Sequence, residues 1–386
     1  MAADEASFPG LDPDQPLIGH DALTAGLTQS MESGRVAHGW LLTGPAGSGK
    51  GLMARMAAAW ILAENRDQGN LLMPGEAAGF SIDPDDPGTG LVIRSSHPDL
   101  SIIEPDLEDN KSGQIKLAQI RKLIAFMGHK PARDGWRVAI IDSMDDVNRN
   151  GANALLKLLE EPPEKTVLFL TASRPGRLPP TIRSRCRVVR IAAPELESCV
   201  ELLGKLMPDG GLPHKDLANL AEGAPGRALR LAESGAADCY FAVCRLLAAP
   251  LLDAPALATI CTKWGKGGAD GAALREGAQW LIARLLRLSA ISAGAGPSTD
   301  ICEFEHPAIA HLCTVHSADR LATAHAEFLE SAQKADGLYL DFAHFLEREL
   351  TKLHQKSLPW RSVVVTSCQR DLQRQPCAFT ILWTAE

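Results

Sequence analysis

The stretch from Trp136 to Cys186 constrains the fold of this chain more than any other. It begins with an apolar run, residues 138–141, which ends in Asp142, and a second apolar run follows at residues 167–170. Two buried strands joined by a helix predict a βαβ crossover in a parallel sheet, an arrangement that places ligands beyond the carboxyl ends of the strands. The helix is indicated by apolar residues at helical spacing before a pair of prolines: Ala154, Leu155, Leu158 and Leu159.

A phosphate-binding loop is predicted near the amino end. A strand expected at residues 38–42 runs into Gly44-Pro-Ala-Gly-Ser-Gly-Lys50-Gly51, and a helix is expected from Lys50 to about residue 63. In such a loop, glycines let backbone N–H groups turn toward a phosphate, and the lysine reaches the terminal phosphates. The alternative is a structural relic that keeps the fold and binds nothing. The expected site for ATP comprises Gly44, Gly47, Gly49, Lys50, Gly51 and Asp142.

The final position of this motif departs from the usual pattern. A Ser or Thr hydroxyl there normally holds the magnesium ion that bridges the β- and γ-phosphates. This chain has Gly51 instead, which has no side chain to coordinate a metal. Metal positioning should therefore suffer even if the nucleotide binds.

Charge is segregated along the sequence. The 386 residues carry a formal net charge of −8, which argues against bulk attraction to nucleic acid. Residues 111–137 nevertheless hold seven Lys or Arg against one acid, and residues 174–190 hold six Arg and no acid. A helix is expected over residues 114–127, and its basic residues either solvate it or contact a nucleic-acid backbone. These candidate DNA-binding residues are Lys116, Arg121 and Lys122.

The cysteines indicate neither a metal site nor a disulfide framework. All nine lie at or after Cys186, and no two form a Cys-x-x-Cys pair. The first residues are acidic without an apolar core, and no run approaches the ~20 apolar residues of a membrane span. We therefore expect a cytoplasmic chain with no metal and no membrane contact.

Four motifs occur together in this chain: the phosphate loop, Ile141-Asp142-Ser143, the Leu-Leu-Lys-Leu-Leu-Glu-Glu-Pro-Pro segment and Ser184-Arg185-Cys186. In this combination the chain resembles the clamp-loader branch of AAA+ ATPases over at least residues 17–234. The resemblance implies an α/β fold in which a P-loop core with a parallel sheet precedes two helical domains. The implied ranges are 1–192 for the nucleotide-binding-like core, 193–236 for a helical lid, 237–355 for an all-α collar used in oligomerisation, and 356–386 for a tail of unknown structure.

Measured against active members of this family, the chain lacks three catalytic parts. Their Walker B strand ends in Asp-Glu, whereas here Ser143 follows Asp142, and a hydroxyl cannot act as a carboxylate base. Gly226 takes the place of the lid-helix sensor arginine, and Arg227 is one residue out, about 100° around a helix. With Gly51 as the third loss, the resemblance implies a non-catalytic or ATPase-deficient subunit.

Arg185, by contrast, matches the family. In relatives, the arginine of Ser-Arg-Cys projects into the nucleotide site of the next subunit and stabilises charge on the γ-phosphoryl group. Such an arginine finger can contribute ~10³ to 10⁵ in rate. The alternative role for Arg185 is a structural ion pair within its own domain.

The resemblance also implies partners and leaves other functions open. The partners are the motor (gamma/tau) and delta subunits of a clamp loader, a sliding clamp and primer-template DNA, in a hetero-oligomer. Many relatives carry a four-cysteine zinc module, but residues 64–99 contain no Cys, so no zinc is expected. A surface insertion or mobile loop is predicted at residues 64–96 instead. Two alternatives remain: an ATP-hydrolysing motor subunit of the same loader and a standalone DNA-binding module.

Overall fold

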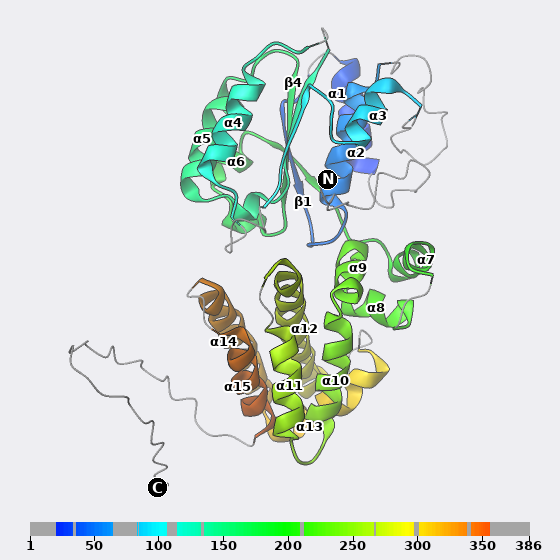
Figure 1. The fold of residues 1–386 in the computed structure, drawn as a ribbon, viewed down its shortest axis with the longest axis vertical. Helices are drawn as coiled ribbons and strands as arrows, with labels where there is room; N and C mark the ends of the chain where they lie inside the picture. The colour runs from blue at the N-terminus through cyan, green and yellow to red at the C-terminus, as the bar shows by residue number, and fades with distance from the viewer. Residues whose placement is uncertain are drawn as a thin grey trace, which may run out of the picture.

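A five-stranded parallel sheet forms the first part of the chain (Figure 1). The strand order is β2-β3-β4-β1-β5, with bounds β1 (Gly39–Thr43), β2 (Leu100–Ile103), β3 (Arg137–Ile141), β4 (Thr166–Ala172) and β5 (Arg187–Arg190). The predicted crossover is confirmed, because β3 and β4 pair in parallel and α5 (Arg149–Glu160) connects them. The computed structural model describes residues 21–33, 36–64, 83, 85–105, 114–132, 135–208, 212–265, 268–296, 301–337 and 341–355.

Helices cover both faces of this sheet (Figure 1). Because successive side chains of a strand point to opposite faces, Trp40 and Leu42 of β1 pack with one helical layer and Leu41 with the other. The strands other than β2 and β5 are buried along their whole length, as expected for a parallel sheet covered on both sides. The first layer holds α1 (Asp21–Glu32), α2 (Lys50–Leu62) and α3 (Pro87–Ile93), and the second holds α4 (Leu117–Met127), α5 and α6 (Pro180–Arg183).

Neither α3 nor β5 was predicted from the sequence. The insertion expected at residues 64–96 contains α3, which corrects that expectation for this segment; residues 65–82 and 84 lie outside the described residues. Asp86 caps α3 by accepting a hydrogen bond from Thr89 N, and proline follows at the first helical position, a start signal that the surrounding glycines obscured. The short strand β5 has no long apolar run to mark it.

The second part of the chain is entirely helical in its described residues. Its buried side chains form one continuous hydrophobic cluster, from Cys199 to Leu353. The expected class of fold, a P-loop core followed by helical regions, is therefore confirmed, while the lid–collar boundary at residue 236 stays a prediction. The helices are α7 (Leu196–Leu206), α8 (His214–Leu220), α9 (Pro225–Glu233), α10 (Ala236–Ala248), α11 (Ala254–Trp264), α12 (Gly268–Ala295), α13 (His306–Val315), α14 (Ala318–Gly337) and α15 (Phe342–His354).

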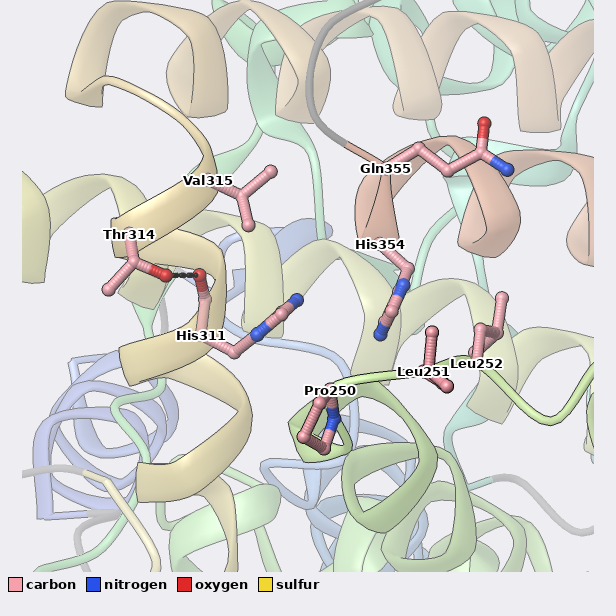
Figure 2. Close-up of a pocket in the computed structure, with 8 residues that line it drawn as sticks. All are labelled: Pro250, Leu251, Leu252, His311, Thr314, Val315, His354 and Gln355. Atoms are coloured by element: carbon pink, nitrogen blue, oxygen red, sulfur yellow. Dashed lines mark hydrogen bonds between the residues drawn. The ribbon is translucent and has the colours of Figure 1, made fainter.

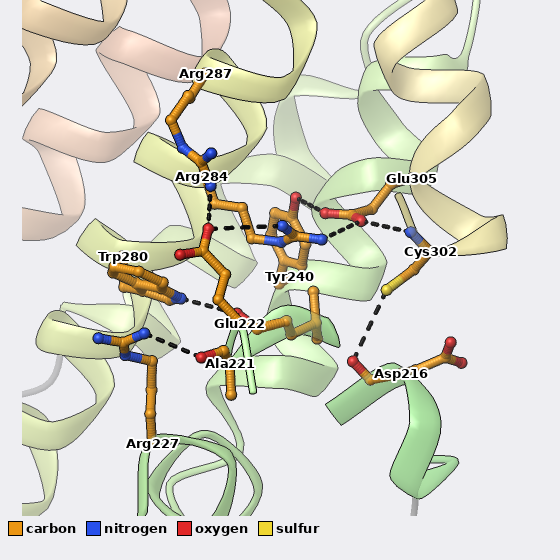
Figure 3. A network of polar contacts seen from close by, with 11 residues as sticks. Asp216, Ala221, Glu222, Arg227, Tyr240, Trp280, Arg284, Arg287, Cys302 and Glu305 are labelled. Carbon is orange, nitrogen blue, oxygen red and sulfur yellow. Dashed lines mark hydrogen bonds and ion pairs between the residues drawn. The ribbon is translucent and has the colours of Figure 1, made fainter. Parts of the chain in front are cut away.

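A buried ion pair lies inside this helical region (Figure 3). The guanidinium of Arg284 on α12 lies 3.1 Å from the carboxylate of Glu305, and both side chains are almost fully buried. The carboxylate also accepts hydrogen bonds from the Tyr240 hydroxyl at 2.7 Å and from Cys302 N at 2.8 Å. A buried charge with this many partners keeps its desolvation penalty compensated, so the network holds α10, α12 and the start of α13 in one arrangement.

Candidate functional site

The predicted phosphate loop lies at the carboxyl end of β1 and leads into α2, as the sequence indicates. Gly47 and Gly49 adopt positive φ values of 80° and 88°, a region that L side chains rarely occupy. Gly44 is required for a different reason, because a Cβ there would lie 1.9 Å from the carbonyl oxygen of Ile191. The glycines thus serve the backbone path of the loop.

Lys50 is directed back onto this loop. Its Nζ donates hydrogen bonds to the carbonyl oxygens of Gly44 at 3.0 Å and Pro45 at 2.6 Å, and the side chain is buried. Burial lowers the pKa of Lys50 from 10.5 to about 8, although the nearby carboxylates of Asp142 and Asp145 act in the opposite direction. The ammonium group is therefore satisfied by the loop itself.

Gly51 packs against the carboxylate of Asp142. A Cβ at position 51 would lie 2.1 Å from Asp142 Oδ2, so a Ser or Thr could not coexist with this carboxylate position. Thr171, at the end of β4, donates from its hydroxyl to Asp142 Oδ1 at 2.7 Å. The carboxylate of Asp142 thus occupies the space next to Gly51.

Ser143 follows Asp142 in an unusual backbone conformation, with φ 86° and ψ 81°. Its N–H donates to Thr171 Oγ1 at 2.8 Å, and its hydroxyl donates to the carboxylate of Asp146 in the short helix η1 (Met144–Asp146). Burial raises the pKa of Asp146, and the hydrogen bond from Ser143 partly offsets this rise. Ser143 therefore shapes the turn after β3.

These donors do not fit a bound magnesium ion. Magnesium is held octahedrally by oxygen ligands, commonly one or two carboxylates together with substrate phosphates and water. Here Gly51 supplies no ligand, Ser143 is committed to Asp146, and Asp142 is engaged by Thr171. Throughout the part of the chain that the structure describes, no group of three or more His, Cys, Asp or Glu is arranged to hold a metal.

The amino end of α9 is seated directly on the phosphate loop. Gly226 N donates to the carbonyl oxygen of Gly47 at 2.9 Å. A Cβ on Gly47 would lie 2.4 Å from Arg227 N, and a Cβ on Gly226 would lie 3.1 Å from Gly47 O. This close approach of the two backbones requires glycine at position 47, and glycine at position 226 avoids a tight contact with the loop.

Arg227 is occupied on the side of α9 that faces the following helices (Figure 3). Its Cζ lies 3.5 Å from the ring centroid of Trp280 on α12, and Nη1 donates to the carbonyl oxygen of Ala221 at 3.0 Å. Burial lowers the pKa of Arg227 to about 10. The arginine that follows the expected sensor position therefore joins α9 to α12 by a cation–π contact.

Arg185 lies at the opposite end of the sheet from the phosphate loop. Position 39, at the start of β1, adjoins the carbonyl oxygen of Arg185, which a Cβ on Gly39 would meet at 3.4 Å. Gly44 follows five residues later, so about 16 Å of strand separates the two ends. In this chain Arg185 Nη2 lies 2.7 Å from Glu160 Oε1, and Nη1 donates to the carbonyl oxygen of Thr181 at 3.0 Å. The free chain thus shows the ion pair that was the alternative expectation for Arg185, although the sequence did not name Glu160 as the partner.

The three basic residues predicted to bind DNA lie on or next to α4. Lys116, Arg121 and Lys122 are all exposed to solvent. A bridge between Ile115 and Val147 brings the first turn of α4 beside that of α5. Arg149, exposed in the first turn of α5, therefore lies near the start of α4 and was not singled out from the sequence, although Asn148 before it is a recognisable helix cap.

A cavity of about 550 Å³ lies far from the phosphate loop, between α13, the end of α15 and the loop that follows α10 (Figure 2). Its walls include two stacked imidazoles, His311 and His354, with centroids 4.7 Å apart and planes inclined at 24°. Because the nitrogen lone pairs of nearly parallel rings do not converge, these two histidines do not form a chelating pair.

Within the described ranges, no helix is both long enough and apolar enough to cross a bilayer.

The parallel sheet, the glycine loop ahead of α2 and the helices after β5 define a P-loop protein of the AAA+ type. A profile described as DNA polymerase III, delta subunit, matches residues 19–195. The delta' subunit of DNA polymerase III from Pseudomonas aeruginosa is 34% identical over 200 residues, which make up 52% of this chain and 57% of that protein. The delta' subunit from Yersinia pestis is 30% identical over 269 residues, 68% of this chain and 73% of that protein.

The chain belongs to the DNA polymerase III delta' family. It is also similar to the tau subunit from Escherichia coli, with 27% identity over 227 residues, 58% of this chain and 33% of that protein. Among solved structures, a DNA polymerase III gamma subunit-related protein from Thermotoga maritima shares 17% identity at a TM-score of 0.39, over 86% of this chain and 99% of that one. The family assignment rests on the sequence relatives, and the match spans little more than half the length of the Pseudomonas protein.

Proposed function

We propose that this chain is a non-catalytic subunit of a DNA polymerase III clamp loader. It completes a hetero-oligomeric ring with motor (gamma/tau) and delta subunits, helps to hold primer-template DNA while a sliding clamp is loaded, and presents Arg185 to the nucleotide site of a neighbouring motor subunit. The proposal draws on the family of the chain, whose relatives are DNA polymerase III subunits.

The position of Arg185 carries this proposal. The side chain is about one-third exposed and lies at the end of the sheet opposite the phosphate loop of its own chain. With about 16 Å of strand between them, a nucleotide that Arg185 contacts belongs to another subunit. A planar, permanently charged guanidinium suits such a contact with phosphoryl oxygens.

The phosphate loop supports the non-catalytic half of the proposal. Asp142 lies where a hydroxyl at position 51 would have to go, and Ser143 supplies no carboxylate to orient water. Arg227, packed on Trp280, is unavailable to a γ-phosphate. Whether or not Lys50 still contacts ATP, these three positions leave the chain without the parts needed for hydrolysis.

The proposed DNA contact uses the surface where α4 and α5 begin. Exposed Lys116, Arg121, Lys122 and Arg149 can pair with phosphates without reading sequence. Backbone N–H groups at the starts of two adjacent helices add to the attraction for an anion. Because four such cations make a small surface, we expect weak, salt-sensitive DNA binding by the chain alone and tighter binding by the assembled ring.

Steady-state ATP hydrolysis by the purified chain, with primed DNA present, tests this proposal. We expect no turnover above that of the Lys50→Ala variant, which serves as the control for contaminating ATPases. Robust turnover that Lys50→Ala abolishes would instead establish an ATP-hydrolysing motor subunit. Tight, salt-sensitive DNA binding without partners would favour a standalone DNA-binding module.

A further inference from the structure

The Glu160-Glu161-Pro-Pro segment carries two acidic side chains. Within the described residues, the structure shows an ion pair only for Glu160, and its partner is Arg185. Glu160 is the last residue of α5, and Glu161 N donates to Lys157 O at 3.0 Å to close the helix. Pro162 and Pro163 then prevent the helix from continuing. The carboxylate is thus carried on the rigid end of a helix beside the arginine.

Two contacts set the orientation of the Arg185 guanidinium. Glu160 Oε1 lies 2.7 Å from Nη2, and the carbonyl oxygen of Thr181 accepts a hydrogen bond from Nη1 at 3.0 Å. Both acceptors belong to the same chain, so the guanidinium is held against its own domain. The side chains of Arg185 and Glu160 are nevertheless 35% and 47% exposed, which means that water and ions reach the pair.

A phosphoryl oxygen and a carboxylate oxygen compete for the same kind of N–H donor. Both are anionic acceptors that guanidinium binds through short, charge-assisted hydrogen bonds. A carboxylate that stayed beside the guanidinium would also oppose the positive charge offered to a γ-phosphoryl group and would repel that group. Full engagement of Arg185 with a nucleotide therefore requires its ion pair with Glu160 to break.

We propose that Glu160 is a positioning residue. It holds the guanidinium of Arg185 against its own domain in the free chain, and it competes with the neighbouring subunit's ATP for that guanidinium. This inference rests on the proposed function of Arg185 as a trans arginine finger. Because the ion pair is exposed, it is weak enough to be exchanged on assembly, and its removal should change the competition by about two- to fivefold. Glu160 itself contacts no substrate.

The Arg185–Glu160 ion pair can be tested on the full-length free chain, without any partner. Phenylglyoxal modifies accessible guanidinium groups, and mass spectrometry of the peptide that contains Arg185 gives the rate at this residue. Glu160→Gln should accelerate the modification about two- to fivefold, whereas Glu161→Gln, with the same change of charge one residue later, should leave it unchanged. An unaltered rate in Glu160→Gln would overturn the proposal.

The competition is tested in the clamp loader reconstituted from this chain with motor and delta subunits. Glu160→Gln should raise kcat/KM for ATP about two- to fivefold, mainly through a lower KM, and Glu161→Gln should not. In the Arg185→Ala background, Glu160→Gln should have no effect. An effect that persists in that background, or an unchanged KM, would overturn the role of Glu160. Normal hydrolysis by Arg185→Ala alone would instead refute the trans finger, so the two failures are distinguishable.

Discussion

Gly51 lies against the carboxylate of Asp142, which is itself held by the hydroxyl of Thr171. A larger residue at position 51 would have to displace that carboxylate. Gly51→Ser should therefore destabilise the fold by about 1–3 kcal/mol, the usual cost of overpacking a closely packed site. Urea unfolding of the two proteins gives the difference.

The matched control is Gly176→Ser, since a Cβ at Gly176 meets nothing within 4 Å. This variant should keep the stability of the unmodified chain to within about 0.5 kcal/mol, as for most surface substitutions. Equal stability of the two serine variants would show that Asp142 moves aside freely.

Lys50 makes the stability of the fold depend on alkaline pH. Burial lowers its pKa from 10.5 to about 8, so between these values the unfolded chain binds more protons than the folded chain. The free energy of unfolding should therefore rise as the pH increases from 8 toward 10.5, by up to about 3 kcal/mol from this group. Below pH 8 the charged ammonium is present in both states and this gain is absent.

Lys50→Met isolates that contribution, because it removes the charge and keeps the length of the side chain. The difference in unfolding free energy between unmodified chain and variant should shift in favour of the unmodified chain between pH 8 and 10. Lys122→Met, at an exposed position, should show no such shift. A pH-independent difference for Lys50→Met would mean that the ammonium is not desolvated.

Among the helices, α10, α12 and α13 depend on a buried charge. Glu305 accepts from Tyr240 and Cys302 N and pairs with Arg284, with no exposure of its side chain. Glu305→Ala removes the principal counter-charge of Arg284, so the free energy of unfolding should fall by about 3–5 kcal/mol. Thermal unfolding of this variant beside Glu303→Ala, an exposed acid on the same turn, measures the effect. A melting temperature equal to that of Glu303→Ala would contradict it.

Hydrophobic periodicity made most of the elements predictable. The runs around Val138 and Val167 are buried strands, and the stripe before Pro162 is α5. The same signal failed for α3, where Gly88 packs close to another backbone segment; a Cβ at Gly88 would lie 2.3 Å from Leu62 O. It also failed for β5, where only Val189 is buried. Short elements take their structure from tertiary contacts that a local pattern does not encode.

The candidate sites divide in the same way across the whole molecule. The phosphate loop could be placed from the sequence because its residues are consecutive and each has a defined role. The seating of Gly226 on Gly47, and the pairing of Glu160 with Arg185, join segments that are distant in the chain. Such contacts follow from the way the sheet and helices pack, so the structure was needed to find them.

The two ends of the sheet thus have separate roles in the proposed assembly. The end with Lys50 and Asp142 is filled by the chain's own groups and by the start of α9. The end with Arg185 carries an exposed guanidinium in a weak ion pair. Under the proposed function, the chain contributes to ATP hydrolysis only in the subunit next to it.

Hydrolysis of ATP by a reconstituted clamp loader that contains Arg185→Ala tests this division most directly. The complex should assemble normally, as judged by its elution volume, because Arg185 lies in an exposed pair that stabilises the fold little. Its DNA-stimulated rate at the affected site should fall by ~10³-fold or more, within the range known for arginine fingers. An assembled complex that hydrolyses ATP at the unmodified rate would contradict the trans role of Arg185.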